Sequence, residues 1–203
     1  MIGQKPVQHK EAQRIHHIMK VIRPPTPSGI AIDGGAHVGS WTLEMCKYFK
    51  LVYAFEPCTE SFQMLLQNMV NNDLLDKTEL FNNALSNMRH MVKMVAPRGR
   101  STLTARQMKI SSKGNVEAVT IDSLDLPGCD LIKLDLEGAE ALALQGARLT
   151  IDKFHPFLII EFNNLVRQYG NSEDHLEKRI KKLGYEMVWR DGVDRGFQWK
   201  GMV

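Results

Sequence analysis

The sequence lacks the features that mark membrane-spanning and secreted proteins. No run of about 18 apolar residues occurs, so we expect no helix that crosses a membrane. The stretch Met1–Lys20 carries charged residues and three histidines where a secretory signal peptide would have an apolar core. These absences favour a protein that does not act in a membrane.

Cysteine is scarce, and its positions are far apart. Cys46, Cys58 and Cys129 are odd in number and form no Cys-x-x-Cys pair. We therefore expect neither a disulfide framework nor a zinc site. Reduced thiols are typical of the cytoplasm, so the sequence predicts a cytoplasmic protein.

Acidic residues are missing from one segment, Met88–Val116. Its seven basic residues are Arg89, Lys93, Arg98, Arg100, Arg106, Lys109 and Lys113. The whole chain has 26 basic and 23 acidic residues, so this segment supplies the positive balance of +3. It could recruit an anionic ligand, such as a phosphorylated sugar or nucleic acid, or it could be a solvated flap. It contains no aromatic residue for base stacking, which disfavours single-stranded nucleic acid.

The rest of the sequence is ordinary for one globular domain. The chain has 203 residues, of which 43% are hydrophobic and 24% charged. Apolar runs typical of strands alternate with helical segments, the order that gives a parallel α/β sheet. The expected strands are Ile30–Ile32, Leu51–Phe55, Thr78–Phe81, Leu131–Leu134 and Phe157–Ile160, with a closing hairpin of Tyr185–Trp189 and Gly196–Lys200.

The alternation also indicates the domain organisation. Pro6–Ile22 has apolar residues at helical spacing and is followed by a proline-rich break. We therefore expect residues 1–28 to form an N-terminal helix and a proline-rich linker. Residues 29–203 would form the main domain, with a basic insertion, a hairpin plus a short helix, at about residues 88–116. One helix is expected from Ala139 to about Leu149.

A glycine-rich turn follows the first expected strand and precedes a helix, the setting of a cofactor-binding turn. Its candidate binding residues are Asp33, Gly34, Gly35, Ala36, His37 and Gly39. The middle glycine of a dinucleotide motif is replaced by Ala36, whereas the pattern acid-x-Gly-x-x-x-Gly is complete. The carboxylate of Asp33 suits the ammonium of an amino-acid cofactor, and it would repel a pyrophosphate. The turn therefore disfavours an NAD-dependent oxidoreductase.

Two further strand ends carry candidate binding residues. Glu56 ends the second expected strand, where an acid accepts hydrogen bonds from ribose hydroxyls in Rossmann-like folds. Pro57 stiffens the turn beside it. Asn83, which Ala84 follows, could pair with an adenine edge or could form a turn.

The fourth expected strand ends in a dense group of acids. Asp135, Glu137 and Glu140 would gather at the carboxyl end of the sheet, where ligands of open α/β folds bind. Clustered carboxylates raise one another's pKa, which favours general-base catalysis. Glu140 fits equally well as an acid that complements a helix N-terminus.

Together these motifs resemble the FkbM family of S-adenosylmethionine-dependent methyltransferases, from Gly29 to Trp189. The matching strings are AIDGGAHVG (Ala31–Gly39), YAFEP (Tyr53–Pro57), NALS (Asn83–Ser86), VTIDSL (Val119–Leu124), DLIKLDLEGAE (Asp130–Glu140), LQGA (Leu144–Ala147) and PFLIIEFN (Pro156–Asn163). The resemblance implies a Rossmann-like class I methyltransferase fold, an α/β fold with a seven-stranded, mostly parallel sheet, helices on both faces and an antiparallel last strand. It implies methyl transfer to a hydroxyl of a sugar, glycan or small natural product.

The resemblance also implies residue roles. Asp33, Gly35 and Gly39 would contact the methionine part of S-adenosylmethionine, Glu56 its ribose, and Asn83 would lie near its adenine. His37 stands where asparagine is common in the family, and residues 1–28 match nothing in it.

Methyl transfer to a hydroxyl requires a group that removes its proton. We expect Asp135 to be this base and to lie beside the cofactor, with Glu137 and His37 as rivals; His37 could instead be a structural donor in the turn. Asp135 and Glu161 end neighbouring strands and Asn163 follows, so their oxygens could bind Mg²⁺. No tight ligand motif is present, so a divalent metal is not expected.

Two alternatives stay open at this point. A nucleic-acid methyltransferase would use the basic segment to hold phosphates, but the turn after the fourth strand lacks the Asn/Asp-Pro-Pro-aromatic pattern of base methyltransferases. A non-catalytic cofactor-binding module would not need the intact set of acids and glycines. The acceptor is therefore expected to be a small molecule or glycan, either neutral or anionic.

Overall fold

The computed structural model describes residues 9–21, 29–95, 107–110, 114–170 and 172–201. Helix α1 (His9–Val21) confirms the expected N-terminal helix, whereas the proline-rich linker lies outside the described residues. None of the described helices is both long and apolar enough to cross a membrane.

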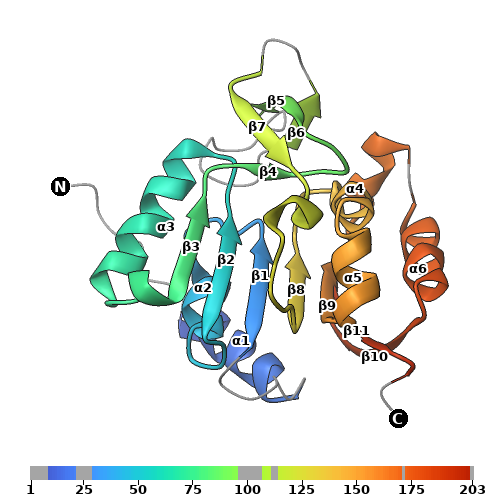
Figure 1. Cartoon of the computed structure of the whole chain (residues 1–203), viewed down its shortest axis with the longest axis horizontal. Helices are drawn as coiled ribbons and strands as arrows, with labels where there is room; N and C mark the ends of the chain where they lie inside the picture. Colours follow the sequence, from blue (N-terminus) through green and yellow to red (C-terminus); the bar gives the residue numbers. More distant parts are fainter. Residues whose placement is uncertain (1–8, 22–28, 96–106, 111–113, 171, 202–203) are drawn as a thin grey trace.

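A seven-stranded sheet in the order β10-β11-β9-β8-β1-β2-β3 forms the centre of the molecule (Figure 1). The strands are β1 (Ile30–Gly34), β2 (Leu51–Phe55), β3 (Thr78–Phe81), β8 (Leu131–Leu134), β9 (Phe157–Glu161), β10 (Tyr185–Asp191) and β11 (Asp194–Trp199). Strands β3, β2, β1, β8 and β9 are parallel, and β11 runs antiparallel to β9. This order confirms the expected α/β fold. The chain adds β2 and β3 on one side of β1, and later β8 and β9 on its other side. Open α/β sheets bind ligands at such a switch in strand order.

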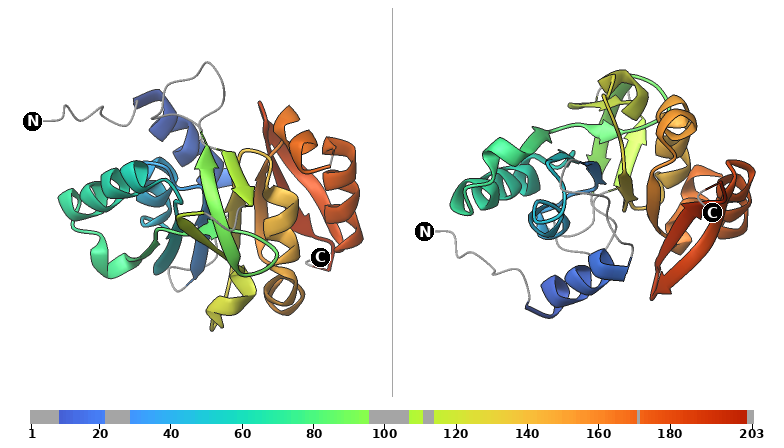
Figure 2. Two further views of the ribbon diagram at one scale, coloured as in Figure 1. Left: turned by 90° about the horizontal axis from the view of Figure 1, so that it is seen from above. Right: turned by 60° about the horizontal axis from the view of Figure 1, so that its bottom comes forward.

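Helices cover both faces of this sheet (Figures 1 and 2). The helices are α2 (Ser40–Met45), α3 (Thr59–Asn71), α4 (Glu140–Gln145), α5 (Arg148–Phe154) and α6 (Glu173–Lys182), with short 3₁₀ turns η1 (Leu75–Lys77), η2 (Ile121–Leu124) and η3 (Asn164–Tyr169). On one face, apolar residues of α1, α2 and α3 pack against Ala31, Val52 and Ala54. On the other face, residues of α4, α5 and α6 pack against Ile32 and Ile132. Strand residues therefore alternate between two separate cores.

The helix expected over Ala139–Leu149 is wrong in one respect, because the structure has two helices there. Gly146 separates α4 from α5. A Cβ atom on Gly146 would lie 2.0 Å from the carbonyl oxygen of Ser86. The chain therefore bends where its backbone meets the segment that follows β3.

The basic segment belongs to a second sheet, of four strands in the order β4-β7-β5-β6. These strands are β4 (Ala84–Leu85), β5 (His90–Val95), β6 (Gln107–Ile110) and β7 (Val116–Val119). Strands β5 and β6 pair antiparallel, and an insertion built as a hairpin stays a prediction. Residues 96–106 and 111–113 lie outside the described part, and the expected short helix with them. Figure 1 shows this second sheet above the carboxyl ends of the parallel strands.

Candidate active site

The glycine turn follows β1 and has a tightly constrained backbone. Gly35 has a φ of 78°, and a Cβ atom on it would lie 1.9 Å from the carbonyl oxygen of Asp135. The backbone N–H groups of Gly35 and Ala36 donate to the carbonyl of Phe55 at 3.0 and 2.9 Å. Gly39 has a φ of 95°, and a Cβ there would lie 2.8 Å from Leu65. Only glycine fits such positions without strain, as the sequence pattern indicated.

His37 lies at the tip of this turn. Its φ is 52°, a left-handed conformation that is uncommon for residues other than glycine. Its side chain is exposed, and its backbone N–H donates to Oε2 of Glu56 at 2.9 Å. His37 thus contributes its backbone N–H to the turn, and its roles as a base or as a structural donor both stay predictions.

Glu56 follows β2 and is buried beside the glycine turn. Its Oε1 accepts a hydrogen bond from the backbone N–H of Cys58 at 2.8 Å, across Pro57. Burial raises the pKa of Glu56, while the bonds from Cys58 and His37 lower it in part. Each carboxylate oxygen holds one backbone N–H and retains a lone pair, which is the arrangement that a diol requires.

Asn83 and Ala84 lie where the main sheet passes into the second sheet. The Asn83 amide donates to the carbonyl of Glu117 at 3.1 Å, and Ala84 is buried in β4. The neighbouring Asn82, which the sequence did not single out, donates to the carbonyl of Glu56 at 2.8 Å. A contact between Asn83 and adenine stays a prediction.

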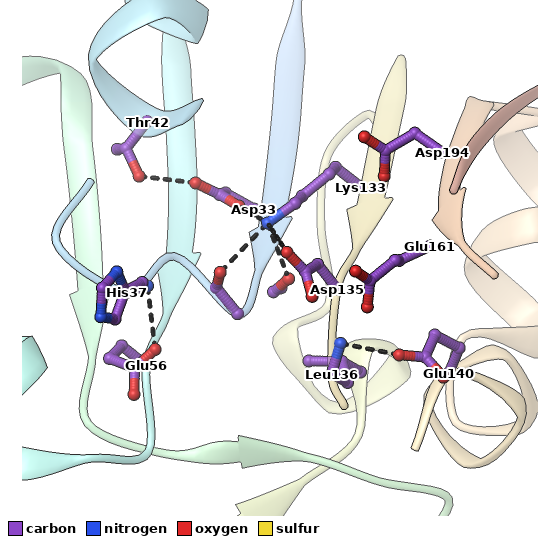
Figure 3. A network of polar contacts seen from close by, with 12 residues as sticks. Asp33, His37, Thr42, Glu56, Lys133, Asp135, Leu136, Glu140, Glu161 and Asp194 are labelled. Carbon is purple, nitrogen blue, oxygen red and sulfur yellow. Dashed lines mark hydrogen bonds and ion pairs between the residues drawn. The ribbon is translucent and has the colours of Figure 1, made fainter. Parts of the chain in front are cut away.

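The acidic turn follows β8, and Glu140 shapes it. Glu140 is fully buried, and its Oε1 accepts hydrogen bonds from the backbone N–H groups of Leu136 at 2.8 Å (Figure 3) and of Gly138 at 3.1 Å. Burial raises the pKa of Glu140 to about 7. Glu137 has a φ of 53°, so a second residue of the site holds a left-handed backbone. Such strain is concentrated at functional sites.

Asp33 forms an ion pair inside the protein. It is fully buried, accepts a hydrogen bond from Thr42 Oγ1 at 2.7 Å, and forms an ion pair with Lys133 at 3.1 Å (Figure 3). Lys133 thus supplies an ammonium to Asp33 within the protein, and a contact between Asp33 and the methionine part of a cofactor stays a prediction. Sequence reasoning missed Lys133, although a lone lysine in an apolar strand was the signal. The parallel register of β1 and β8 places the two residues side by side.

Asp135 and Glu161 meet at the ends of β8 and β9. Burial, the charge of Asp135 and a hydrogen bond to Asp135 raise the pKa of Glu161 to about 9. Asn163 donates to Glu161, and its own Oδ1 accepts from the backbone N–H of Leu165 at 3.0 Å. Asp194 of β11 pairs in register with Glu161. The residues suggested for Mg²⁺ thus form a hydrogen-bonded group, and the described residues contain no cluster of three His, Cys, Asp or Glu arranged for a metal.

The glycine turn, Glu56 and the acids Asp135 and Glu161 thus lie together at the carboxyl ends of β1, β2, β8 and β9. This sheet order and this site define the class I methyltransferase fold. The sequence pattern of the methyltransferase FkbM domain matches residues 33–187, so the chain belongs to the FkbM methyltransferase family. No protein with a curated function matches the chain in sequence.

Solved structures agree on the fold. The FkbM methyltransferase from Methylobacillus flagellatus KT is 19% identical with a TM-score of 0.59, over 85% of this chain and 43% of that one. This chain therefore spans less than half the length of that protein. A proposed methyltransferase from Streptococcus mutans in complex with SAH (S-adenosylhomocysteine) is 12% identical with a TM-score of 0.56, over 97% of both chains. Magnesium protoporphyrin IX methyltransferase from Synechocystis PCC 6803, with bound SAM (S-adenosylmethionine), is 15% identical with a TM-score of 0.53, over 96% of this chain and 84% of that one.

Proposed function

We propose that the chain is an S-adenosylmethionine-dependent methyltransferase that methylates a hydroxyl of a sugar, glycan or small natural product. One observation carries the cofactor half of this proposal. The buried carboxylate of Glu56 is held beside a glycine turn by two backbone N–H groups, ready to accept a diol. Family membership and the SAM and SAH held by two structural neighbours support the same cofactor.

The residues present suit this cofactor. The glycine turn lies beside Glu56, which would hold the ribose, and Asn83 would lie near the adenine. When bound, S-adenosylmethionine supplies an electrophilic methyl group to a nucleophile held in line with it.

Asp135 is the residue that we propose as base for the acceptor hydroxyl. Its side chain is 39% exposed at the carboxyl end of β8, so an acceptor can reach it. Burial, the charge of Asp135 and a hydrogen bond to Asp135 raise the pKa of the neighbouring Glu161 to about 9, so Glu161 keeps its proton at neutral pH. Glu137 lies two residues further along the same turn and stays the rival base.

The described acceptor edge is rich in acids, which favours a neutral hydroxyl over a phosphate. Glu161 and Asp194 lie beside Asp135 there, and the exposed side chain of Asp135 would disfavour an anionic acceptor. Most of the basic residues of the Met88–Val116 segment lie outside the described part, so an anionic acceptor stays a prediction from the sequence.

Calorimetric titration with S-adenosylmethionine, S-adenosylhomocysteine and NAD tests the cofactor. We expect micromolar binding of both sulfur compounds, weakened at least about tenfold in Glu56→Ala, because each tenfold loss corresponds to about 1.4 kcal/mol, the size of one or two hydrogen bonds. Glu79→Ala is the matched control, since Glu79 is an exposed acid on the neighbouring strand β3. Binding of NAD alone would refute the proposal, and binding of none of the three would favour a non-catalytic module.

An acceptor screen tests the second half. Neutral sugars and their phosphates are incubated with S-adenosylmethionine, and methylated product is measured by mass spectrometry. We expect product from the neutral series, lost in Asp135→Asn while cofactor affinity is kept. Product from sugar phosphates alone would assign the acceptor to the anionic class.

A further inference from the structure

A charged side chain lies in the centre of the molecule. Lys133 is 2% exposed and sits between Ile132 and Leu134 in β8, a strand that is buried along its whole length. An ammonium in such a place is strongly unfavourable unless oxygen atoms replace its water. The groups that contact its ammonium therefore indicate the role of Lys133.

The Lys133 ammonium is surrounded by oxygen atoms from two turns (Figure 3). On the glycine-turn side, it lies 3.1 Å from Oδ1 of Asp33, and it donates to the carbonyl of Gly35 at 3.0 Å and of Gly34 at 3.4 Å. On the acidic-turn side, it lies 3.9 Å from Oδ2 of Asp135. One cation thus holds the backbone of the first turn and faces a carboxylate of the second.

Other groups around Lys133 keep it charged. Burial lowers its pKa, but the charges of Asp33, Asp135 and Asp194 and the hydrogen bond to Asp33 raise it above the ordinary value. The ring of Trp41 in α2 lies 5.8 Å from the ammonium. The lysine is therefore a cation throughout the neutral range.

The two turns also meet through their backbones. The N–H of Asp135 donates to the carbonyl of Gly34 at 3.1 Å, and the missing Cβ of Gly35 leaves room for the carbonyl of Asp135. A shift of either turn would therefore displace the other, and Lys133 contacts both turns.

We propose, resting on the function proposed above, that Lys133 is a positioning residue that holds the glycine turn against the acidic turn and thereby sets the affinity of the cofactor site. A lysine that only balanced the charge of Asp33 would stabilise the fold without controlling ligand affinity. The hydrogen bonds to the carbonyls of Gly34 and Gly35 separate these two roles, because charge balance does not need them.

The test compares Lys133→Met with Asp33→Asn, which measures any direct contribution of Asp33 to binding, and with the double variant Lys133→Met/Asp33→Asn, which removes both charges of the buried pair. Lys153→Met is the matched control, since Lys153 is an exposed lysine of α5. Affinity for S-adenosylhomocysteine is measured by calorimetry, stability by thermal unfolding, and local order by amide hydrogen exchange of the protein without ligand.

We expect Lys133→Met to weaken binding at least about tenfold. The amides of Gly35, Ala36 and Asp135 should exchange faster, while those of β10 and β11 keep wild-type rates. The double variant should regain much of the lost melting temperature without regaining affinity, since neither Met nor Asn restores the bonds to the glycine carbonyls. It also carries the test if Lys133→Met fails to fold.

Three results would overturn the proposal: wild-type affinity in Lys133→Met, affinity that recovers in step with stability in the double variant, or faster exchange spread evenly over the molecule. If the wild-type protein bound no S-adenosylhomocysteine, the proposed function would fail instead. The exchange pattern would then decide alone whether Lys133 orders the two turns.

Discussion

At the scale of single residues, the site depends on positions where a side chain would collide with backbone. Gly35 is the sharpest case, since its absent Cβ atom is what allows the glycine turn to touch the turn after β8. Gly192, at the tip of the β10–β11 hairpin, has a similar φ of 61° but open space around it. Substitutions at the two glycines therefore distinguish the effect of a positive φ on stability from the effect of a steric collision.

We predict that Gly35→Ala lowers the free energy of unfolding by about 2–4 kcal/mol, because strain at positive φ adds to a collision with the Asp135 carbonyl. Gly192→Ala should lose only about 1 kcal/mol, the strain alone. Urea unfolding of the two variants measures both losses. Equal losses would show that the two turns can separate without penalty.

The raised pKa of Glu161 gives the fold a pH dependence with a definite sign. An unfolded glutamate loses its proton near its ordinary pKa of about 4.3, whereas folded Glu161 keeps it up to about pH 9. Between these values the folded state binds more protons than the unfolded state, so stability falls as pH rises.

Glu161→Gln should remove this contribution, since glutamine cannot lose a proton. We predict that the melting temperature of the wild type falls between pH 5 and pH 9 by on the order of 5 °C more than that of the variant. Glu79→Gln, on the exposed side of β3, should follow the wild type. Parallel curves for Glu161→Gln and wild type would contradict the assigned protonation.

At the scale of elements, Arg14 joins helix α1 to the β10–β11 hairpin. Its guanidinium bonds to Asp194 and to Asp191, each at 2.6 Å. Asp194 is nearly buried and lies beside Glu161, so this cation also lies next to the acids at the ends of β8 and β9. The N-terminal helix is therefore a part of the site's surroundings.

We predict that Arg14→Met lowers stability by about 1–3 kcal/mol, because it leaves the Asp194 carboxylate buried without its cation. The loss should shrink in Arg14→Met/Asp194→Asn. Arg148→Met removes the exposed Arg148–Asp152 pair and should change stability by less than about 1 kcal/mol. Thermal unfolding compares the three. A loss no larger than that of Arg148→Met would mean that the helix docks through its apolar residues alone.

Elements differ in how well sequence alone located them. Leu51–Phe55, Thr78–Phe81 and Leu131–Leu134 were predicted with their observed bounds, because each ends in an apolar residue that a polar residue follows. The break at Gly146 was missed, and the Ser86 carbonyl that lies against Gly146 is far away in the sequence. The local sequence pattern can therefore predict a strand, whereas a contact between residues far apart in the sequence cannot be predicted from it.

At the scale of the whole molecule, the candidate site shows the same division. Glu56 and the glycine turn were recognisable because strand ends carry the ligand in this kind of sheet. The Asp33–Lys133 pair depends on the register between β1 and β8, which the sequence order of the strands does not state. Glu140 was ambiguous as a binding acid or a helix-end acid, and its hydrogen bonds to Leu136 and Gly138 make it an organiser of its own turn.

The position of β11 has a consequence for how the chain is made. It is the last described strand, yet it lies between β9 and β10 and pairs with both. During synthesis on a ribosome, β10 therefore emerges before β11, the strand with which it pairs. The edge of β9 stays unpaired until β11 (Asp194–Trp199) has been synthesised. A protein truncated before β11 would expose the unpaired apolar edge of β9, which could aggregate or bind chaperones.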